Sequence, residues 1–263
     1  MENKTITVAQ CRGYAVVTMN RPREMNALSN EMRRELFHVF KMLENDDQVR
    51  SVVLTGGEFV FSAGMDIKEM SSLADEEIDS YFLSITAYLK KIFTFKKPVV
   101  AAVGGIALGG GFNLAVVCDM IIASESAIFG HPELKFGLNP LFHPLAQLVG
   151  MAKAKEITML GEPIGAKEAL RIGLVNKVSP PECFMADALA MAEELTKRSS
   201  EALAAVKRLS DIVPRLEKTA ALDLELGTSA LLFSRPERKA RMNEFIMKEF
   251  LHKMKRREKD SCS

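Results

Sequence analysis

The 263-residue sequence has little excess charge, few cysteines and no long apolar run. Its formal net charge of +1 argues against a specialist for nucleic acids or membrane surfaces. The four cysteines are scattered and form no C-x-x-C pair, so we expect a reducing, cytoplasmic environment and no metal site. No apolar stretch is long enough to cross a bilayer, and the first residues lack the pattern of a signal peptide.

Two phosphate-binding motifs are also missing. The segment 104–111 contains five glycines, but Phe112 and Asn113 follow it where a P-loop needs Lys and Ser or Thr. No G-x-G-x-x-G register fits either, which excludes the dinucleotide fingerprint. Two interpretations remain for this segment. One is a tight turn between a strand and a helix. The other is an oxyanion hole, which requires a second N–H donor from elsewhere in the chain.

Strand and helix patterns alternate in the first half of the chain, whereas the second half is almost entirely helical. The change lies near residue 190, and a long C-terminal helical region commonly packs on a partner subunit. The expected strands are 6–9 and 14–19 as a hairpin, then 51–55, 98–103, 119–124 and 127–130. The expected helices are one capped by Ser29, then 75–91, one from 112, and 152–160, 166–172, 183–198, 200–211, 216–233 and 236–257.

Four motifs in this order resemble those of the crotonase (enoyl-CoA hydratase/isomerase) superfamily. The resemblance covers about residues 5–250. The motifs are Asn20-Arg21-Pro22 with Asn26-Ala27-Leu28; the segment 61–70, similar to F-x-A-G-x-D-[IL]-K-E; the segment 97–103 with Gly109-Gly110-Gly111 and Cys118-Asp119; and Phe129-Gly130-His131-Pro132-Glu133, which matches F-G-x-P-E.

The resemblance implies an α/β fold, a crotonase-like spiral of ββα repeats that binds acyl-CoA, in residues 1–190. It implies a C-terminal α-helical trimerisation region in residues 191–263, and assembly into a homotrimer or a dimer of trimers. The implied substrate is a coenzyme A thioester, with no further cofactor. Composition adds that neither nucleic acid nor a membrane is an expected partner.

By the same resemblance, the backbone N–H groups of Met65 and Gly110 bind the thioester oxygen. This agrees with the oxyanion-hole interpretation of the glycine run, because two preorganised donors favour an enolate over the ground state. The residues implied to bind coenzyme A are Met25, Ala27, Ala63, Asp66 and Ile67, joined by Phe245 and Lys248 from a neighbouring subunit.

The implied catalytic pair departs from that of the hydratases, which use two glutamates. This sequence has Asn113 at the first position and Glu133 at the second. An amide cannot take up or deliver a proton at neutral pH. One glutamate is enough for the family's Δ3,Δ2-enoyl-CoA isomerases, in which it moves a proton between the α- and γ-carbons. Residue chemistry therefore favours double-bond isomerisation, with Glu133 in an apolar pocket supplied by Phe129, Leu134 and Phe136.

Several alternatives stay open. Hydration is possible if Asn113 and one carboxylate position the water, and a decarboxylase or hydrolase can use the same oxyanion hole. A non-enzymatic RNA-binding homologue is the rival in another class, with a small basic cluster formed by Lys90, Lys91, Lys96 and Lys97. Asn113 can also serve as a local partner of the helix N-terminus, and Glu133 as a turn carboxylate.

The loop after Gly137 is the second departure. Hydratases usually carry a P-G-x-G-G turn here, whereas residues 138–145 are bulkier, so we expect a reshaped acyl pocket. His131 and His143 both lie in this loop region. Each is either an auxiliary acid or base, since histidine titrates near neutrality, or a packing residue.

Overall fold

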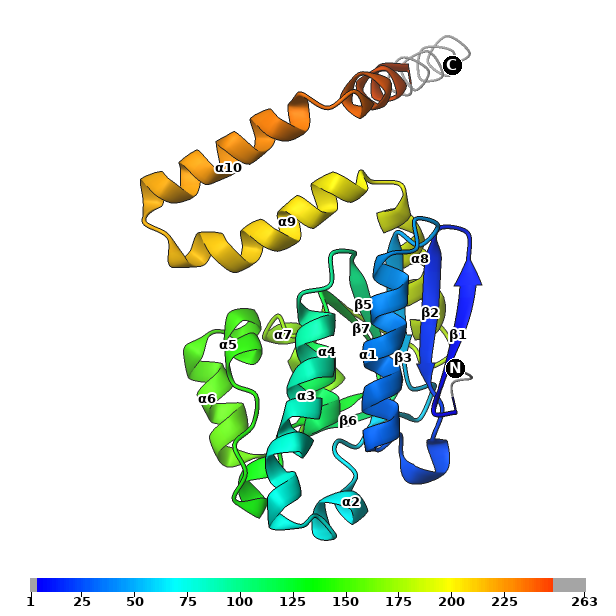
Figure 1. Ribbon diagram of the computed structural model, residues 1–263, viewed down its shortest axis with the longest axis vertical. Helices are drawn as coiled ribbons and strands as arrows, with labels where there is room; N and C mark the ends of the chain where they lie inside the picture. Colours follow the sequence, from blue (N-terminus) through cyan, green and yellow to red (C-terminus); the bar gives the residue numbers. More distant parts are fainter. Residues whose placement is uncertain (1–3, 248–263) are drawn as a thin grey trace, which may run out of the picture. The chain divides into compact units, whose positions relative to one another are not determined.

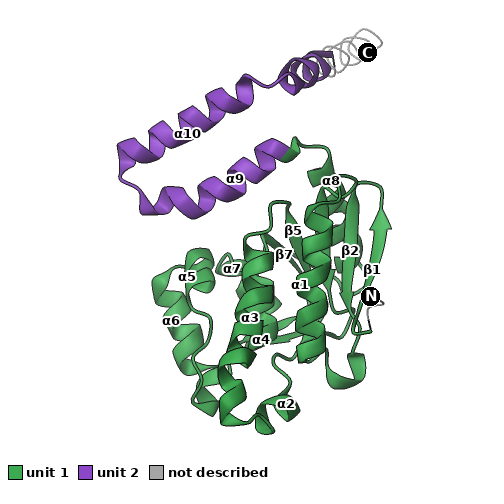
Figure 2. Ribbon diagram, in the orientation of Figure 1, with its two compact units in different colours: residues 1–200 green, residues 201–263 purple. Residues whose placement is uncertain are grey.

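The computed structural model describes residues 4–247 (Figure 1). The chain divides into two compact units, residues 1–200 and 201–263 (Figure 2). The sequence placed the division at 190/191, ten residues earlier. The difference arises from α8 (Phe184–Thr196), which belongs to the first unit because Phe184, Ala188 and Ala192 are buried against the large sheet.

A six-stranded sheet forms the centre of the first unit, in the order β1-β2-β3-β5-β7-β10. The predicted hairpin is present: β1 and β2 pair antiparallel, with Cys11 opposite Tyr14. All other neighbours in this sheet are parallel. The strands are β1 (Ile6–Cys11), β2 (Tyr14–Met19), β3 (Ser51–Thr55), β5 (Val99–Val103), β7 (Met120–Ser124) and β10 (Lys177–Ser179).

A second sheet of four short strands has the order β4-β6-β8-β9. Each of β3, β5 and β7 lies in the large sheet, and the strand that follows it in the chain lies in the small one. Helical segments then lead to the next pair of strands. The chain therefore forms a spiral of ββα repeats, which is the fold expected from the resemblance. The strands are β4 (Val60–Ser62), β6 (Ile106–Leu108), β8 (Ile128–Gly130) and β9 (Ile164–Gly165).

Alternation along the buried strands separates two apolar layers. On β5, Val99, Ala101 and Val103 face the main core, while Val100 and Ala102 face α8. Because successive side chains of a strand point to opposite faces, a strand covered on both sides is apolar throughout. The wholly apolar run that predicted this strand therefore reflects burial on both faces.

Helices cover both faces of the large sheet (Figure 1). Ser29 caps α1 as predicted, because its hydroxyl oxygen accepts a hydrogen bond from the N–H of Met32 at 3.3 Å.

No helix of residues 4–247 has the length and apolarity needed to span a membrane. The α-helices besides α8 are α1 (Asn30–Glu44), α2 (Ile67–Ser71), α3 (Ile78–Phe93), α4 (Gly110–Val116), α5 (His143–Val149), α6 (Met151–Leu160), α7 (Ala166–Arg171), α9 (Ser200–Ile212) and α10 (Lys218–Phe233), and residues 237–247 are also helical.

Four short strands differ from the sequence-based expectation, and one of them is β4, which is not among the expected strands. The glycine run is two turns rather than one, because β6 lies between Gly105 and Gly109, and α4 begins at Gly110 instead of Phe112. The strands β9 and β10 lie in the half that was expected to be helical. Each of these strands has two or three residues, too few for an alternating pattern to show in the sequence.

Candidate active site

The site is centred on Glu133 and Asn113, which the fold brings together from separate elements. Glu133 begins a short 3-10 helix, Glu133–Phe136, directly after β8, while Asn113 lies in the first turn of α4. The amide Nδ2 of Asn113 donates to Oε1 of Glu133 at 3.5 Å, a long hydrogen bond. The Glu133 side chain is 14% exposed. The two positions at which hydratases carry glutamates thus form one carboxylate–amide pair.

His131 is part of the same cluster, and its side chain is fully buried. Its Nδ1 hydrogen-bonds Oε1 of Glu133 at 3.4 Å and lies 3.3 Å from Oε2. Its ring packs against that of Phe112, with 4.6 Å between the ring centroids. His143 is exposed at the start of α5. Of the two histidines considered from the sequence, the structure therefore places His131 beside the carboxylate.

Three polar atoms of this cluster lack a hydrogen-bond partner within residues 4–247. They are buried and belong to the three side chains that meet here: Oδ1 of Asn113, Nε2 of His131 and Oε2 of Glu133. Buried polar groups are nearly always paired, so unpaired ones point to a water or a ligand group as their partner. Such a cluster is typical of a site that binds a polar ligand.

The glycines around Glu133 and Met65 allow close approach of the backbone. Gly109 has φ +51° and ψ −123°, a conformation that disfavours other residues, and a Cβ there would lie 3.4 Å from Oε1 of Glu133. Gly64 has φ +103°, and a Cβ there would lie 3.1 Å from the nitrogen of Gly110. The two segments that carry the expected oxyanion donors therefore touch.

The N–H groups of Met65 and Gly110 donate no hydrogen bond to another group of the described chain. Gly110 is the first residue of α4, where an N–H has no intrahelical acceptor. Met65 forms an isolated parallel bridge with Leu28, through the hydrogen bond from the N–H of Leu28 to the carbonyl of Gly64 at 2.8 Å. Both N–H groups are thus available to an acceptor.

The apolar surroundings of Glu133 differ from the expectation. Leu134 and Phe136 are 46% and 67% exposed, so they do not enclose the carboxylate within this chain. A single 3-10 turn carries them outward. The buried rings near the cluster are those of Phe112 and Phe129, whose centroids are 5.7 Å apart.

The segments expected to bind coenzyme A lie side by side. The N–H of Ala63 donates to the carbonyl of Met25 at 3.0 Å, and the hydroxyl of Ser62 donates to the carbonyl of Asn26 at 2.8 Å. Met25 and Ile67 are exposed, as a surface that takes a ligand requires. The structure therefore groups Met25, Ala27, Ala63, Asp66 and Ile67 at one edge of the first unit.

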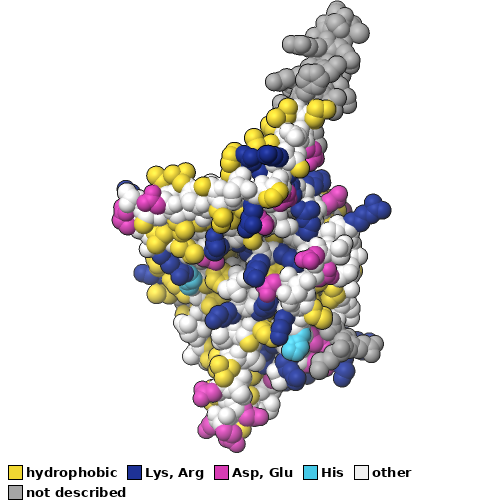
Figure 3. All heavy atoms as spheres, turned by 45° about the horizontal axis from the view of Figure 1, so that its top comes forward, with side chains coloured by type: hydrophobic (Ala, Val, Ile, Leu, Met, Phe, Trp, Pro, Cys, Tyr) yellow, Lys and Arg dark blue, Asp and Glu magenta, His cyan; other side chains and the backbone are white. Residues whose placement is uncertain are grey.

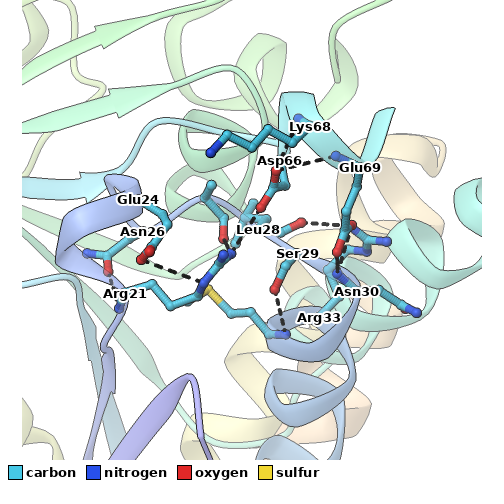
Figure 4. A network of polar contacts seen from close by, with 12 residues as sticks. Arg21, Glu24, Asn26, Leu28, Ser29, Asn30, Arg33, Asp66, Lys68 and Glu69 are labelled. Carbon is cyan, nitrogen blue, oxygen red and sulfur yellow. Dashed lines mark hydrogen bonds and ion pairs between the residues drawn. The ribbon is translucent and has the colours of Figure 1, made fainter. Parts of the chain in front are cut away.

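A polar network fixes that edge (Figure 4). Asp66 caps α2 by accepting from the N–H groups of Lys68 and Glu69, and its Oδ2 pairs with Nη1 of Arg21 at 3.2 Å. The same guanidinium nitrogen donates to the carbonyl of Ala27 at 2.9 Å. Asp66 thus has a structural role that the signature motif does not reveal.

Two buried polar residues of this network were missed by sequence reasoning. Asn26 is fully buried, and its Nδ2 donates to the carbonyls of Gly56 and Val60, both at 2.9 Å. Arg33 is 1% exposed and donates to the carbonyl of Leu28 at 2.6 Å. For Asn26 the available signal was its place in the N-R-P…N-A-L motif. The amphipathic pattern of α1 gives no comparable signal for Arg33.

The remaining expected binding residues lie in the other unit. Phe245 is 65% exposed in the helical residues 237–247, and Lys248 lies outside the described residues. In the expected basic cluster, Lys91 forms an ion pair with Glu44, and Lys97 donates to the carbonyls of Leu43 and Asp46. On the face drawn in Figure 3, basic side chains are scattered among acidic and apolar ones rather than gathered in a stripe.

The spiral of ββα repeats, with Glu133 at the end of β8 and the glycine run at the start of α4, defines a protein of the crotonase superfamily. Residues 10–256 match the enoyl-CoA hydratase/isomerase family. The chain belongs to this family of enzymes.

Relatives and solved structures agree with this assignment. The short-chain-enoyl-CoA hydratase of Clostridium acetobutylicum is 37% identical over 261 residues, which cover 98% of this chain and 100% of that protein. A probable enoyl-CoA hydratase of Rhizobium meliloti is 36% identical over 259 residues, with 96% and 100% covered. The crystal structure of an enoyl-CoA hydratase from Bacillus anthracis superposes with a TM-score of 0.89 at 29% identity, covering 93% of this chain and 97% of that one.

Proposed function

We propose that this enzyme moves a carbon–carbon double bond of an enoyl-CoA thioester, with Glu133 as the group that transfers the proton. One observation carries the proposal: Glu133 lies beside the amide of Asn113, at the place where a hydratase has a second carboxylate. An amide neither accepts nor delivers a proton at neutral pH. A reaction that needs one proton carrier fits this pair better than a reaction that needs two.

The steps follow from the arrangement. Oε2 of Glu133 takes a proton from the α-carbon of a 3-enoyl-CoA, and the electron pair of that C–H bond moves toward the thioester. The N–H groups of Met65 and Gly110 hold the oxygen that becomes negative. The carboxylic acid then returns the proton to the γ-carbon, which leaves the double bond between the α- and β-carbons. The proton is recycled, and no second acid is required.

Hydration of a 2-enoyl-CoA is the second candidate, and the unpaired oxygens favour it. A water donating to Oδ1 of Asn113 and Oε2 of Glu133 would satisfy both buried atoms. Glu133 would take one proton from this water as the oxygen bonds to the β-carbon, and would then deliver that proton to the α-carbon. The relatives from Clostridium and Rhizobium are named as hydratases, which also supports this candidate.

Product identification tests the proposal. The protein is incubated separately with a 3-enoyl-CoA and with its 2-enoyl isomer, and the products are separated and identified by mass. We expect the 3-enoyl-CoA to give the 2-enoyl-CoA. A 3-hydroxyacyl-CoA formed from the 2-enoyl isomer, without interconversion of the isomers, would replace isomerisation by hydration. Release of free coenzyme A or of carbon dioxide from other acyl-CoA thioesters would indicate the hydrolase or decarboxylase alternative.

Asn113→Glu should create or greatly raise hydratase activity. The substitution places a second carboxylate at the position whose amide now contacts Glu133, and general acid–base catalysis by a positioned group typically contributes about 10²–10⁴-fold. Asn113→Gln is the matched control, because it has the same length as Glu but stays an amide. Rates of hydration of crotonyl-CoA measure the effect. Equal rates for the two variants would mean that the missing carboxylate does not limit hydration.

The second unit supports the expected assembly into trimers. It exposes large apolar side chains along α10 and along residues 237–247, among them Leu222, Leu226, Phe233 and Phe245. A helical surface of this kind is unfavourable in water unless another surface covers it. We infer that copies of this chain cover it, and that Phe245 reaches the coenzyme A of a neighbouring subunit there.

A further inference from the structure

Two side chains with nitrogen atoms contact the Glu133 carboxylate, those of Asn113 and His131. Nδ2 of Asn113 and Nδ1 of His131 both hydrogen-bond Oε1, at 3.5 and 3.4 Å. Nδ1 of His131 also lies 3.3 Å from Oε2, so the imidazole contacts both oxygens of the carboxylate. The carboxylate is therefore held from one side by an amide and an imidazole.

His131 is held in place for this contact. Its side chain is fully buried, and its ring packs against Phe112, the neighbour of Asn113 in α4. A carboxylate that acts as a base is ionised and only accepts hydrogen bonds, so in that role of Glu133 the nitrogen that faces it must carry the hydrogen. The other ring nitrogen, Nε2, has no partner within the described chain. The contact to Glu133 thus engages one ring nitrogen and not the other.

We propose that His131 is a positioning residue for Glu133: its Nδ1–H holds the carboxylate in the orientation in which it takes and returns the proton. The inference rests on the proposed function of Glu133. The present distances of 3.3–3.5 Å are long, and catalytic hydrogen bonds commonly tighten when substrate binds. His131 itself touches no reacting atom in this role.

Three substitutions at one position separate the two ring nitrogens. In Asn, the amide nitrogen is bonded to Cγ, as Nδ1 is in His, so His131→Asn can still donate to Oε1. In Gln, the amide nitrogen lies one bond further out, at the place of Nε2, so His131→Gln loses that donor. His131→Phe keeps a ring against Phe112 but removes both nitrogens.

Steady-state kinetics of the full-length variants on a 3-enoyl-CoA test the proposal. We expect His131→Gln and His131→Phe to lower kcat by about 10- to 100-fold, by analogy with the loss measured when the partner that orients a metal ligand is removed, with KM changed less than about threefold. We expect His131→Asn to retain kcat within about threefold of the parent protein, because the donor is restored. If His131→Phe fails to fold, the Asn and Gln variants still differ in this one donor.

Two outcomes overturn the inference, and they differ from failure of the proposed function. A kcat of the Gln variant equal to that of the parent, or a kcat of the Asn variant as low as that of the Phe variant at equal thermal stability, removes the role of Nδ1. Glu133→Gln is measured in parallel. If that variant keeps full activity, Glu133 is not the proton carrier. The proposed function is then wrong, whatever the His131 variants show.

Discussion

Glu133→Gln should lower kcat for the enoyl-CoA reaction by about 10²–10⁴-fold, the range that a positioned acid–base group contributes. Gln has nearly the same shape as Glu, and its side-chain oxygen can still accept from Asn113 and His131. The variant therefore keeps the packing of the cluster and loses only the capacity to carry a proton. Both candidate reactions use this group, so the loss is expected for isomerisation and for hydration alike.

Two further variants test whether the loss of turnover depends on the exact position of the carboxylate and on this site. Glu133→Asp keeps a carboxylate but retracts it by one methylene, and a misplacement of about 1 Å can cost about 10²-fold. Glu125→Gln removes an exposed carboxylate that follows β7, and its kcat should equal that of the parent. Unchanged turnover of Glu133→Gln, measured with either isomer as substrate, would contradict a proton-carrying role for this residue.

Long elements with repeated patterns could be predicted from the sequence. The strand 51–55 was predicted to the residue, and the hairpin and the Ser29 cap are present. Their signals are local: alternation, an apolar run between breakers, and a hydroxyl before an amphipathic helix. The strands β4, β6, β9 and β10 have no such signal, because pairing with distant strands, rather than local preference, makes two or three residues extended.

The residues that make up the site were easier to predict than the contacts between them. The family motifs identified Asn113 and Glu133 as neighbours in function, and the structure brings them to 3.5 Å. The burial of His131 could not be predicted, because the residue follows β8 in a segment that looks like a loop. Phe136 was placed in the pocket because it is apolar, whereas the direction of a side chain in a 3-10 turn depends on where the turn docks.

Removing either backbone donor should cost about 10²–10³-fold in kcat, about 2.7–4 kcal/mol of transition-state stabilisation, the measured range for one oxyanion-hole donor. Proline has no N–H, so Met65→Pro and Gly110→Pro each delete one donor. Neither change breaks a hydrogen bond of the described chain, because both N–H groups are unpaired there. Gly110 is also the first residue of α4, the helix position at which proline is tolerated best.

Matched variants separate the donor from the side chain. Met65→Leu keeps the N–H and about the same volume, and Gly110→Ala adds a Cβ that would lie 3.1 Å from Sδ of Met65, the flexible end of that side chain. Because the alanine and proline variants at 110 share this crowding, the ratio of their kcat values isolates the N–H. Thermal unfolding shows whether each variant keeps its fold. If folded proline variants turn over as fast as their partners, no enolate oxygen is held between residues 65 and 110, and neither the isomerase nor the hydratase mechanism can operate at this site.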